Sequence, residues 1–178
     1  MEMTREKIMR KIALGIMFVL LSASSLAYAA SGKVIIKGTK DGSLVDGQVM
    51  LTDAVDGLKI FGDIKGVPPG KHGFHIHENG SCQDEGKAAG GHFNPDQMPH
   101  GLLSNDGFAH AHAGDLGNVE IGADGSGKID TMLKGLTLSE GKYAVLGKSI
   151  ILHEKEDDFG QPTGNAGSRI GCGVIETA

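Results

Sequence analysis

Residues 73–77 read Gly73-Phe74-His75-Ile76-His77, a run in which apolar side chains alternate with imidazoles. Side chains two residues apart in a β-strand point to the same face. Phe74 and Ile76 are therefore expected to enter a core. The two imidazoles then lie side by side on the other face, as half of a metal site of the kind that copper and zinc prefer. Histidine pairs on strands are common at protein surfaces, so this pair alone is a weak indication.

Short extended runs bounded by turn-forming residues lie on both sides of this strand. They cover residues 33–38, 48–54, 58–64, 72–77, 117–121, 127–133, 143–153 and 173–176. Turn residues separate them in Lys40-Asp41-Gly42, Asp56-Gly57, Pro68-Pro69-Gly70 and Ala123-Asp124-Gly125. The mature chain has no stretch with the periodicity of an amphipathic helix. The pattern predicts an all-β protein, an eight-stranded antiparallel barrel or sandwich.

Two long segments, 78–115 and 154–169, interrupt this regular alternation of strands and turns. Loops longer than about 12–15 residues are usually functional or disordered. The first segment contains His92, His100, His110 and His112, and His153 lies at the edge of the second. We therefore expect two long functional loops that carry most of the chemistry.

Length and composition limit the class of protein. The 178 residues include 29 Gly, two Cys and no Trp, and 39% are hydrophobic, which fits one globular domain. The formal charge is −5 and 4% of the residues are aromatic. A nucleic acid partner is therefore not expected, because it needs positive charge for phosphates or aromatic rings for bases.

The first 29 residues have the three parts of an export signal. A basic segment with Arg5, Lys7, Arg10 and Lys11 precedes an apolar run over 12–21, and Ala27-Tyr28-Ala29 matches a small-x-small cleavage site. The run is shorter than the roughly 20 residues of a spanning helix, so no membrane anchor is expected. We predict a cleaved leader over 1–29 and one domain over 30–178, located in the periplasm or secreted. The leader has four Lys or Arg and two Glu, so the mature charge is −7.

Five blocks carry a resemblance to a known family. They are Gly73-Phe74-His75-Ile76-His77-Glu78, Gly90-Gly91-His92-Phe93-Asn94-Pro95 with His100-Gly101, His112-Ala113-Gly114-Asp115-Leu116-Gly117-Asn118, His153-Glu154-Lys155-Glu156-Asp157-Asp158, and residues 164–175. In this order they resemble the copper/zinc superoxide dismutases, here of an exported, bacterial periplasmic type. The resemblance implies a Greek-key β-barrel that binds copper and zinc. It also implies an enzyme that disproportionates superoxide to oxygen and hydrogen peroxide.

The resemblance further implies a role for each residue of the site. His75, His77, His92 and His153 match copper ligands, and His92, His100, His112 and Asp115 match zinc ligands. His92 would thus bridge the two metals. Asp157 matches a carboxylate that hydrogen-bonds one ligand of each metal, here His75 and His100. Arg169 matches the arginine beside copper, where a permanently charged guanidinium suits a small anion; catalysis is assigned to His92 and Arg169.

The two cysteines, Cys82 and Cys172, fit an exported chain. An even pair in an oxidising compartment is expected to form a disulfide, and both also match the family's positions. A closed loop of roughly 90 residues stabilises a fold by about 4–5 kcal/mol in the chain-entropy model. The bond would tie the first long loop to the strand that follows Arg169.

Two segments depart from the better-known intracellular members. Residues 158–169 are short and lack the charged residues of those members' guidance loop. An acidic chain that attracts an anion needs a local positive potential, for which Lys155 is one candidate.

Residues 102–108 are inserted before the last zinc ligands, where they would form an interface or cap the zinc site. Two histidines lie outside the expected ligand set: His110 is a weaker zinc candidate than His112, and His72 has no evident partner.

Other functions and assemblies stay open. An exported copper/zinc storage or carrier module needs neither a bridging ring nor an anion-binding arginine, so His92 and Arg169 disfavour it. A copper-only relative is disfavoured by the intact set of zinc ligands. Family members dimerise through different surfaces and some are monomers, so a homodimer stays open.

Overall fold

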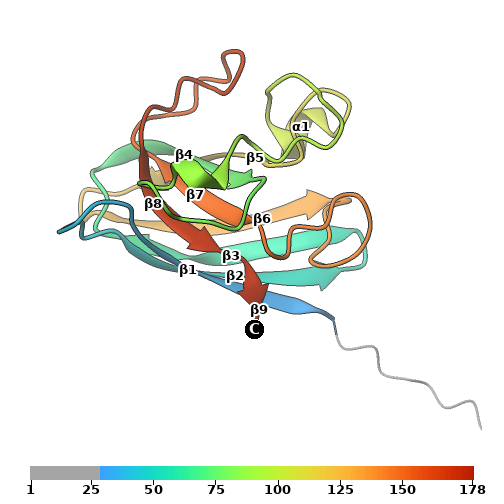
Figure 1. The fold of residues 1–178 in the computed structure, drawn as a ribbon, viewed down its shortest axis with the longest axis horizontal. Helices are drawn as coiled ribbons and strands as arrows, with labels where there is room; N and C mark the ends of the chain where they lie inside the picture. The colour runs from blue at the N-terminus through green and yellow to red at the C-terminus, as the bar shows by residue number, and fades with distance from the viewer. Residues whose placement is uncertain (1–28) are drawn as a thin grey trace, which may run out of the picture.

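The computed structural model describes residues 29–178 as a barrel of strands with loops gathered at one side (Figure 1). The strands are β1 (Ser31–Gly38), β2 (Asp46–Ala54), β3 (Gly57–Lys65), β4 (Gly70–His77), β5 (Asp115–Ile121), β6 (Ser126–Lys134), β7 (Ser149–His153), β8 (Arg169–Val174) and β9 (Glu176–Thr177). A 3-10 turn, η1 (Lys87–Ala89), and a short helix, α1 (Leu103–Asp106), lie in the first long loop. The predicted leader falls on residues that lie, except for Ala29, outside the described part. Among the described residues, no helix is both long and apolar enough for a membrane span.

The strands close into a ring. They pair antiparallel in the order β1-β2-β3-β6-β5-β4-β7-β8, and β8 pairs again with β1. The connections from β3 to β4 and from β6 to β7 cross over neighbouring strands, which gives the Greek-key topology. Two joins are narrow: β5 pairs with β6 at one residue pair, and β1 pairs with β8 at two. The predicted eight-stranded Greek-key barrel is confirmed, and the two-residue β9 adds a short extension beside β1.

Strand β4 shows how the barrel positions the site. Alternate residues of most strands are buried, as in β1, where Val34 and Ile36 are fully buried. In β4, by contrast, both faces are buried from His72 to His77. Phe74 and Ile76 belong to the hydrophobic core, and the long loops cover the other face of the strand. The two imidazoles on that face are therefore held by a rigid strand and shielded from water.

The predicted strand over 143–153 is wrong in its first half. Strand β7 begins at Ser149, and residues 135–148 form a third long connection. Gly147 has a φ of 77°, in the left-handed region, and bends the chain before β7. The Val145 amide donates back to the carbonyls of Thr137 and Leu138. Three apolar side chains of this connection are nevertheless fully or almost fully buried: Leu136, Leu138 and Val145. A buried apolar loop can therefore have the same sequence pattern as a strand.

The last strand of the barrel is displaced from its predicted position over 173–176. Strand β8 runs from Arg169 to Val174, and Ile175 separates it from β9. A Cβ on Gly173 would lie 2.5 Å from the carbonyl oxygen of Ile35 in β1. The close crossing of β8 and β1 thus requires glycine. Because glycine has a low strand propensity, the sequence did not predict the first part of this strand.

The inserted residues 102–108 pack on the barrel itself. Leu103 is buried in the core, and the Phe108 ring stacks on Tyr143 with 3.7 Å between ring centroids. Tyr143 donates to Asp96, which also accepts from Lys142. The insertion therefore fixes the 135–148 connection to the first long loop, and its apolar side chains are largely used within the chain.

Candidate metal centre

Four buried histidines converge on one point. His75 and His77 come from β4, His153 ends β7, and His92 comes from the first long loop. One ring nitrogen of each lies within 4.8 Å of the others. The Nε2 atoms of His77 and His153 are 3.4 Å apart. We call these four residues the copper cluster, after the metal that several imidazoles without thiolate favour.

Hydrogen bonds decide which ring nitrogen faces this point. Nδ1 of His77 donates to the Gly90 carbonyl at 3.0 Å, and Nδ1 of His153 lies 3.3 Å from the Gly167 carbonyl. Each ring therefore directs Nε2 inward, with its lone pair free. The ring of His75 is reversed, because its Nε2 donates to Oδ2 of Asp157 at 2.7 Å. Its buried Nδ1 has no hydrogen-bond partner, as expected for an atom that awaits a metal ion.

A second cluster adjoins the first and shares His92 with it. Its members are His92, His100, His112 and Asp115, which we call the zinc cluster. Nδ1 of His92 lies 2.8 Å from Oδ1 of Asp115 and 3.4 Å from Nδ1 of His112. Tetrahedral zinc with Zn–N bonds of about 2.0–2.1 Å separates its ligand atoms by about 3.3 Å. The spacing and the three-imidazole, one-carboxylate set both fit zinc.

Backbone amides orient the carboxylate of this cluster. Oδ2 of Asp115 accepts from the amides of Gly101 at 3.0 Å and of His112 at 2.9 Å. Burial raises the pKa of Asp115, but the close imidazoles of His100, His112 and His92 outweigh it and hold the pKa well below its usual value. Asp115 is thus a charged ligand inside the protein. Nδ1 of His100 lies 3.0 Å from its Oδ2, yet without hydrogen-bond geometry, which suits two ligands that face one ion.

Asp157 connects the two clusters. Its carboxylate accepts from Nε2 of His75 at 2.7 Å and from Nε2 of His100 at 2.9 Å. Burial opposes protonation of His100, but the neighbouring carboxylates of Asp115 and Asp157 raise its pKa to about 9. Gly164, with a φ of 79°, leaves the space for this carboxylate, because a Cβ there would lie 1.9 Å from Oδ1 of Asp157. The second long loop is thereby folded around one fully buried acid.

His77, His92 and His153 of the copper cluster are neutral when no metal is bound, because their pKa values are low. Burial is the largest cause of the low pKa of each ring, and nearby positive groups lower it further. The pKa falls to about 2 for His77, about 4 for His92 and about 3 for His153. A neutral imidazole has a free lone pair, so these rings are ready to bind metal without first losing a proton.

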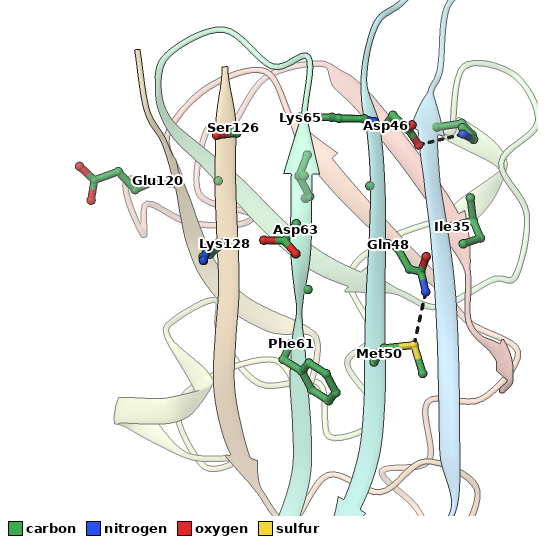
Figure 2. A pocket seen from close by; sticks show the side chains of 15 residues that line it. Ile35, Asp46, Gln48, Met50, Phe61, Asp63, Lys65, Glu120, Ser126 and Lys128 are labelled. Carbon is green, nitrogen blue, oxygen red and sulfur yellow. Dashed lines mark hydrogen bonds and ion pairs between the residues drawn. The ribbon is translucent and has the colours of Figure 1, made fainter. Parts of the chain in front are cut away.

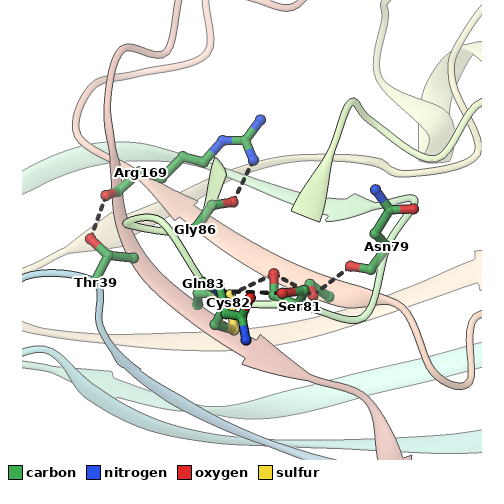
Figure 3. The surroundings of a disulfide bond; sticks show 9 residues. Thr39, Asn79, Ser81, Cys82, Gln83, Gly86 and Arg169 are labelled. Carbon is green, nitrogen blue, oxygen red and sulfur yellow. Dashed lines mark hydrogen bonds between the residues drawn. A yellow bond between two sulfur atoms is a disulfide. The ribbon is translucent and has the colours of Figure 1, made fainter. Parts of the chain in front are cut away.

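Arg169 lies beside the copper cluster and is held by the disulfide loop. Its two terminal nitrogens donate to the carbonyls of Gly86 and Gly90, both at 2.6 Å. Thr39 donates to the Arg169 carbonyl, and Figure 3 shows this bond together with the bond to Gly86. The Gly90 carbonyl also accepts from His77, so one carbonyl joins the arginine to the cluster. Cys82 and Cys172 form a disulfide that closes the base of this loop, as predicted.

The fold and the site together define a class of protein. A Greek-key barrel holds two adjoining clusters of buried ligands. Among the described residues, His92 alone belongs to both the copper cluster and the zinc cluster. The unpaired Nδ1 of His75 and the ligand spacing in the zinc cluster fit two resident cations. The chain therefore has the fold and the paired ligand clusters of a β-barrel metalloprotein, and both clusters consist of imidazole and carboxylate groups.

Comparison with known proteins gives the family. The family model described as copper/zinc superoxide dismutase matches residues 45–175. The extracellular superoxide dismutase [Cu-Zn] of Caenorhabditis elegans is 43% identical over 67% of this chain and 56% of its own length. Superoxide dismutase [Cu-Zn] 5 of Dictyostelium discoideum is 41% identical over 79% of this chain and 93% of its own length. The crystal structure of the clock protein EA4 superposes with a TM-score of 0.75 at 35% identity, covering 84% of this chain and 96% of that one.

The chain belongs to the copper/zinc superoxide dismutase family. As a member it is an oxidoreductase that acts on superoxide with copper and zinc as its metals. The match leaves almost half of the nematode protein uncovered, whereas the Dictyostelium protein is covered almost completely.

Two histidines outside the clusters are also placed by the structure. His110 is exposed and is a member of neither cluster. His72 is buried, and its ring nitrogens lie 2.9 Å from the carbonyl oxygens of Pro68 and His153. It thus joins β4 to the end of β7 behind a copper-cluster residue. Sequence patterns missed this role because both partners are backbone carbonyls, one of them 81 positions away in the chain.

Replacing Asp157 with Asn is expected to weaken zinc binding by about 10–100-fold, the usual effect of losing a partner that orients a metal ligand. The amide has one acceptor oxygen where Asp157 has two, so the shorter contacts of Oδ2 with His75 and of Oδ1 with His100 cannot both be kept, and one ring is held less firmly. Competition with a chromophoric chelator measures the affinity. Asp41→Asn, an exposed carboxylate in a turn, is the matched control. Unchanged zinc affinity in Asp157→Asn would show that Asp157 does not orient the zinc cluster.

Proposed function

We propose that this chain disproportionates superoxide through His92, with the copper cluster, the zinc cluster and Arg169 in the roles that their geometry supports. Two superoxide ions and two protons give one O₂ and one H₂O₂, so one superoxide loses an electron and the other gains it. When bound, copper supplies the one-electron redox chemistry and zinc supplies a fixed charge without redox chemistry. The shared position of His92 carries the proposal, because a storage site gains nothing from a common ligand.

The ligand assignment follows the inward nitrogens. We assign Nδ1 of His75 and Nε2 of His77, His92 and His153 to copper. We assign Nδ1 of His92, His100 and His112 and one carboxylate oxygen of Asp115 to zinc. Asp157 keeps His75 and His100 in the required orientation by accepting from the outward nitrogen of each ring.

His92 also moves a proton in this proposal. Its Nδ1 lies within the zinc cluster, so Nε2 is the atom that can exchange a proton on the copper side. Proton uptake at Nε2 and its later release to the reduced oxygen species supply one of the two protons of H₂O₂. Burial lowers the pKa of this ring to about 4 against the opposing effect of Asp115, so a proton held at the ring is readily released to the reduced oxygen species.

Arg169 binds the substrate anion. Its guanidinium is held by two backbone carbonyls, so its position is fixed before superoxide arrives. A fixed cation next to the copper cluster attracts a small anion and gains affinity by being preorganised. The same charge lowers the pKa of His77 and His153, which places it within electrostatic reach of both rings.

Export of the mature chain is part of the proposal. An extracellular relative, the disulfide and the predicted leader over 1–29 all support it. The periplasm is the destination expected in a bacterial source. Mass determination of the exported protein tests cleavage after Ala29, and sedimentation of the same sample distinguishes a monomer from a homodimer.

A superoxide decay assay tests the proposed activity. Mature protein loaded with one copper and one zinc should accelerate the decay of radiolytic superoxide at a rate that Arg169→Gln lowers about tenfold. Metal analysis and absorption spectra of the same samples show whether both clusters are filled. Fully loaded protein without activity would instead support the storage or carrier function. Full activity without zinc would support a copper-only enzyme.

A further inference from the structure

The four residues of the zinc cluster differ in what holds their backbones. Asp115 begins β5, and the amide of His112 donates to the Asp115 carboxylate at 2.9 Å. His92 forms an isolated β-bridge with His77 of β4. His100, in contrast, lies in an irregular stretch of the first long loop, outside the helices and strands of the described chain. Its position therefore depends on contacts other than strand pairing.

One side chain binds both backbone groups of His100. Nε2 of Gln161 donates to the His100 carbonyl at 2.8 Å, and Oε1 of Gln161 accepts from the His100 amide at 3.0 Å. Within residues 29–178 these two backbone groups make no other hydrogen bond. A pair of N–H···O bonds also joins residues that face each other in an antiparallel sheet. Gln161 therefore supplies, with its side chain, the backbone partner that His100 lacks.

Burial makes these two hydrogen bonds important. His100 exposes only 4% of its surface, so its backbone groups have little access to water. A buried backbone donor or acceptor without a partner is costly. If the Gln161 amide were absent, the chain around His100 would have to move to find new partners. The imidazole would move with it.

The segment that carries Gln161 also holds the ring of His100. Nε2 of the ring donates to Oδ1 of Asp157 at 2.9 Å. The Phe159 ring stacks on the imidazole, with 6.4 Å between the ring centroids and 20° between the planes. Asp157 thus sets the orientation of the ring, whereas Gln161 sets the position of the backbone. Each contact fixes a part of His100 that the other leaves free.

A compact turn presents Gln161 to His100. The amide of Asp158 donates to the Gly164 carbonyl at 2.9 Å, and the amide of Gly164 donates to the Gly160 carbonyl at 2.7 Å. Gln161 lies within this turn and is exposed to solvent as a residue. Packing therefore does not explain the direction of its side chain. The two hydrogen bonds to His100 do.

We propose that Gln161 is a positioning residue for the zinc cluster and holds His100 in place before zinc binds. This inference rests on the proposed function, which assigns His100 to zinc. A ligand that is held in place beforehand loses less freedom on binding, so the cluster binds its ion more tightly. His100 is not a member of the copper cluster, so the effect concerns zinc and not copper.

Gln161→Met tests this role, because methionine has a side chain of similar length that can make neither hydrogen bond. The variant should bind zinc about tenfold more weakly, as expected when a partner that orients a metal ligand is lost. Competition with a chromophoric chelator measures this affinity. The affinity of the copper cluster for copper should stay nearly unchanged.

Two further readouts report on His100 itself and need no turnover. Hydrogen exchange of the His100 amide in metal-free protein should become faster, because the acceptor of its hydrogen bond is lost. Cobalt(II) bound in the zinc cluster has visible absorption bands that depend on the geometry of its ligands. These bands should shift or broaden in Gln161→Met. A general loss of stability would leave the bands of the loaded, folded protein unchanged.

Gln48→Met is the matched control, because it makes the same substitution at an exposed glutamine of β2. Gln48 lines a groove of about 850 Å³ on the outer face of β1, β2, β3 and β6, and no histidine lines this groove (Figure 2). Its amide donates to the Met50 sulfur at 3.9 Å. Zinc affinity, the cobalt bands and exchange of the His100 amide should all remain as in the parent protein.

Two results would overturn the positioning role. One is a Gln161→Met variant that keeps either the zinc affinity or the cobalt bands of the parent. The other is a loss of zinc affinity that is matched by the loss of copper affinity or by Gln48→Met, because the whole fold would then have loosened. A parent protein that binds zinc but does not consume superoxide would contradict the proposed function alone. The zinc and cobalt comparisons would still decide the role of Gln161.

Discussion

Replacing His92 with Gln is expected to lower the rate of superoxide disproportionation by about 10²–10⁴-fold, the usual contribution of a positioned acid–base group. Glutamine can offer one side-chain oxygen to one ion, but it has no second ring nitrogen with a lone pair. The two clusters would lose their common ligand, and the site would lose its proton donor. Absorption and electron paramagnetic resonance spectra of the loaded protein should then resemble those of a copper site without a zinc neighbour.

His110→Gln is the control for this experiment, since it removes an exposed imidazole from the same loop and should keep both the rate and the spectra. His77 and His92 form an isolated β-bridge through their backbones, so the loop can keep its place without the imidazole. Circular dichroism and thermal unfolding of the variant check this. A rate within tenfold of the parent, with both metals bound, would exclude His92 from the proton transfer.

Removing the disulfide with Cys82→Ser and Cys172→Ser is expected to lower the free energy of unfolding by about 4–5 kcal/mol, because the bond closes a loop of 90 residues. Guanidinium unfolding of metal-free protein measures this. Bound metal would mask the difference, since ligands of the native state add their own stabilisation. The parent protein reduced by thiol should show the same loss as the double variant.

A second effect of this change concerns Arg169. The loop closed by Cys82 carries the carbonyls of Gly86 and Gly90 that hold the guanidinium. Figure 3 shows the bond to Gly86. Without the bond the loop moves more freely, and the rate constant should fall even at temperatures where the barrel is folded. Full activity of a folded, disulfide-free protein would show that the rest of the loop positions Arg169 without help.

Much of the fold could be predicted because its information is local. The alternation in β4 predicted which side chains enter the core and which form the site, and turn residues separated most strands correctly. Residues 143–148 misled the prediction, since Val145 is buried in a loop that bends at Gly147. A pattern of apolar residues reports burial, and burial alone does not distinguish a strand from a packed connection.

The sequence predicted which residues form the site, but not which ring nitrogen each histidine directs toward it. Family blocks named the residues that the structure brings together, whereas the inward nitrogen of each ring depends on distant backbone carbonyls such as those of Gly90 and Gly167. The surroundings of Arg169 also depend on contacts that the sequence does not show. Lys40 and Arg169 are 129 positions apart in the chain, and their proximity follows from the pairing of β1 with β8.

The single carboxylate of Asp157 has a thermodynamic consequence for metal loading. It holds one ring of each cluster, so an ion that draws on one of these rings also changes the hydrogen bonds of the acid that the other ring shares. The two loading equilibria are therefore expected to be coupled, and by linkage the coupling has the same size whichever metal arrives first.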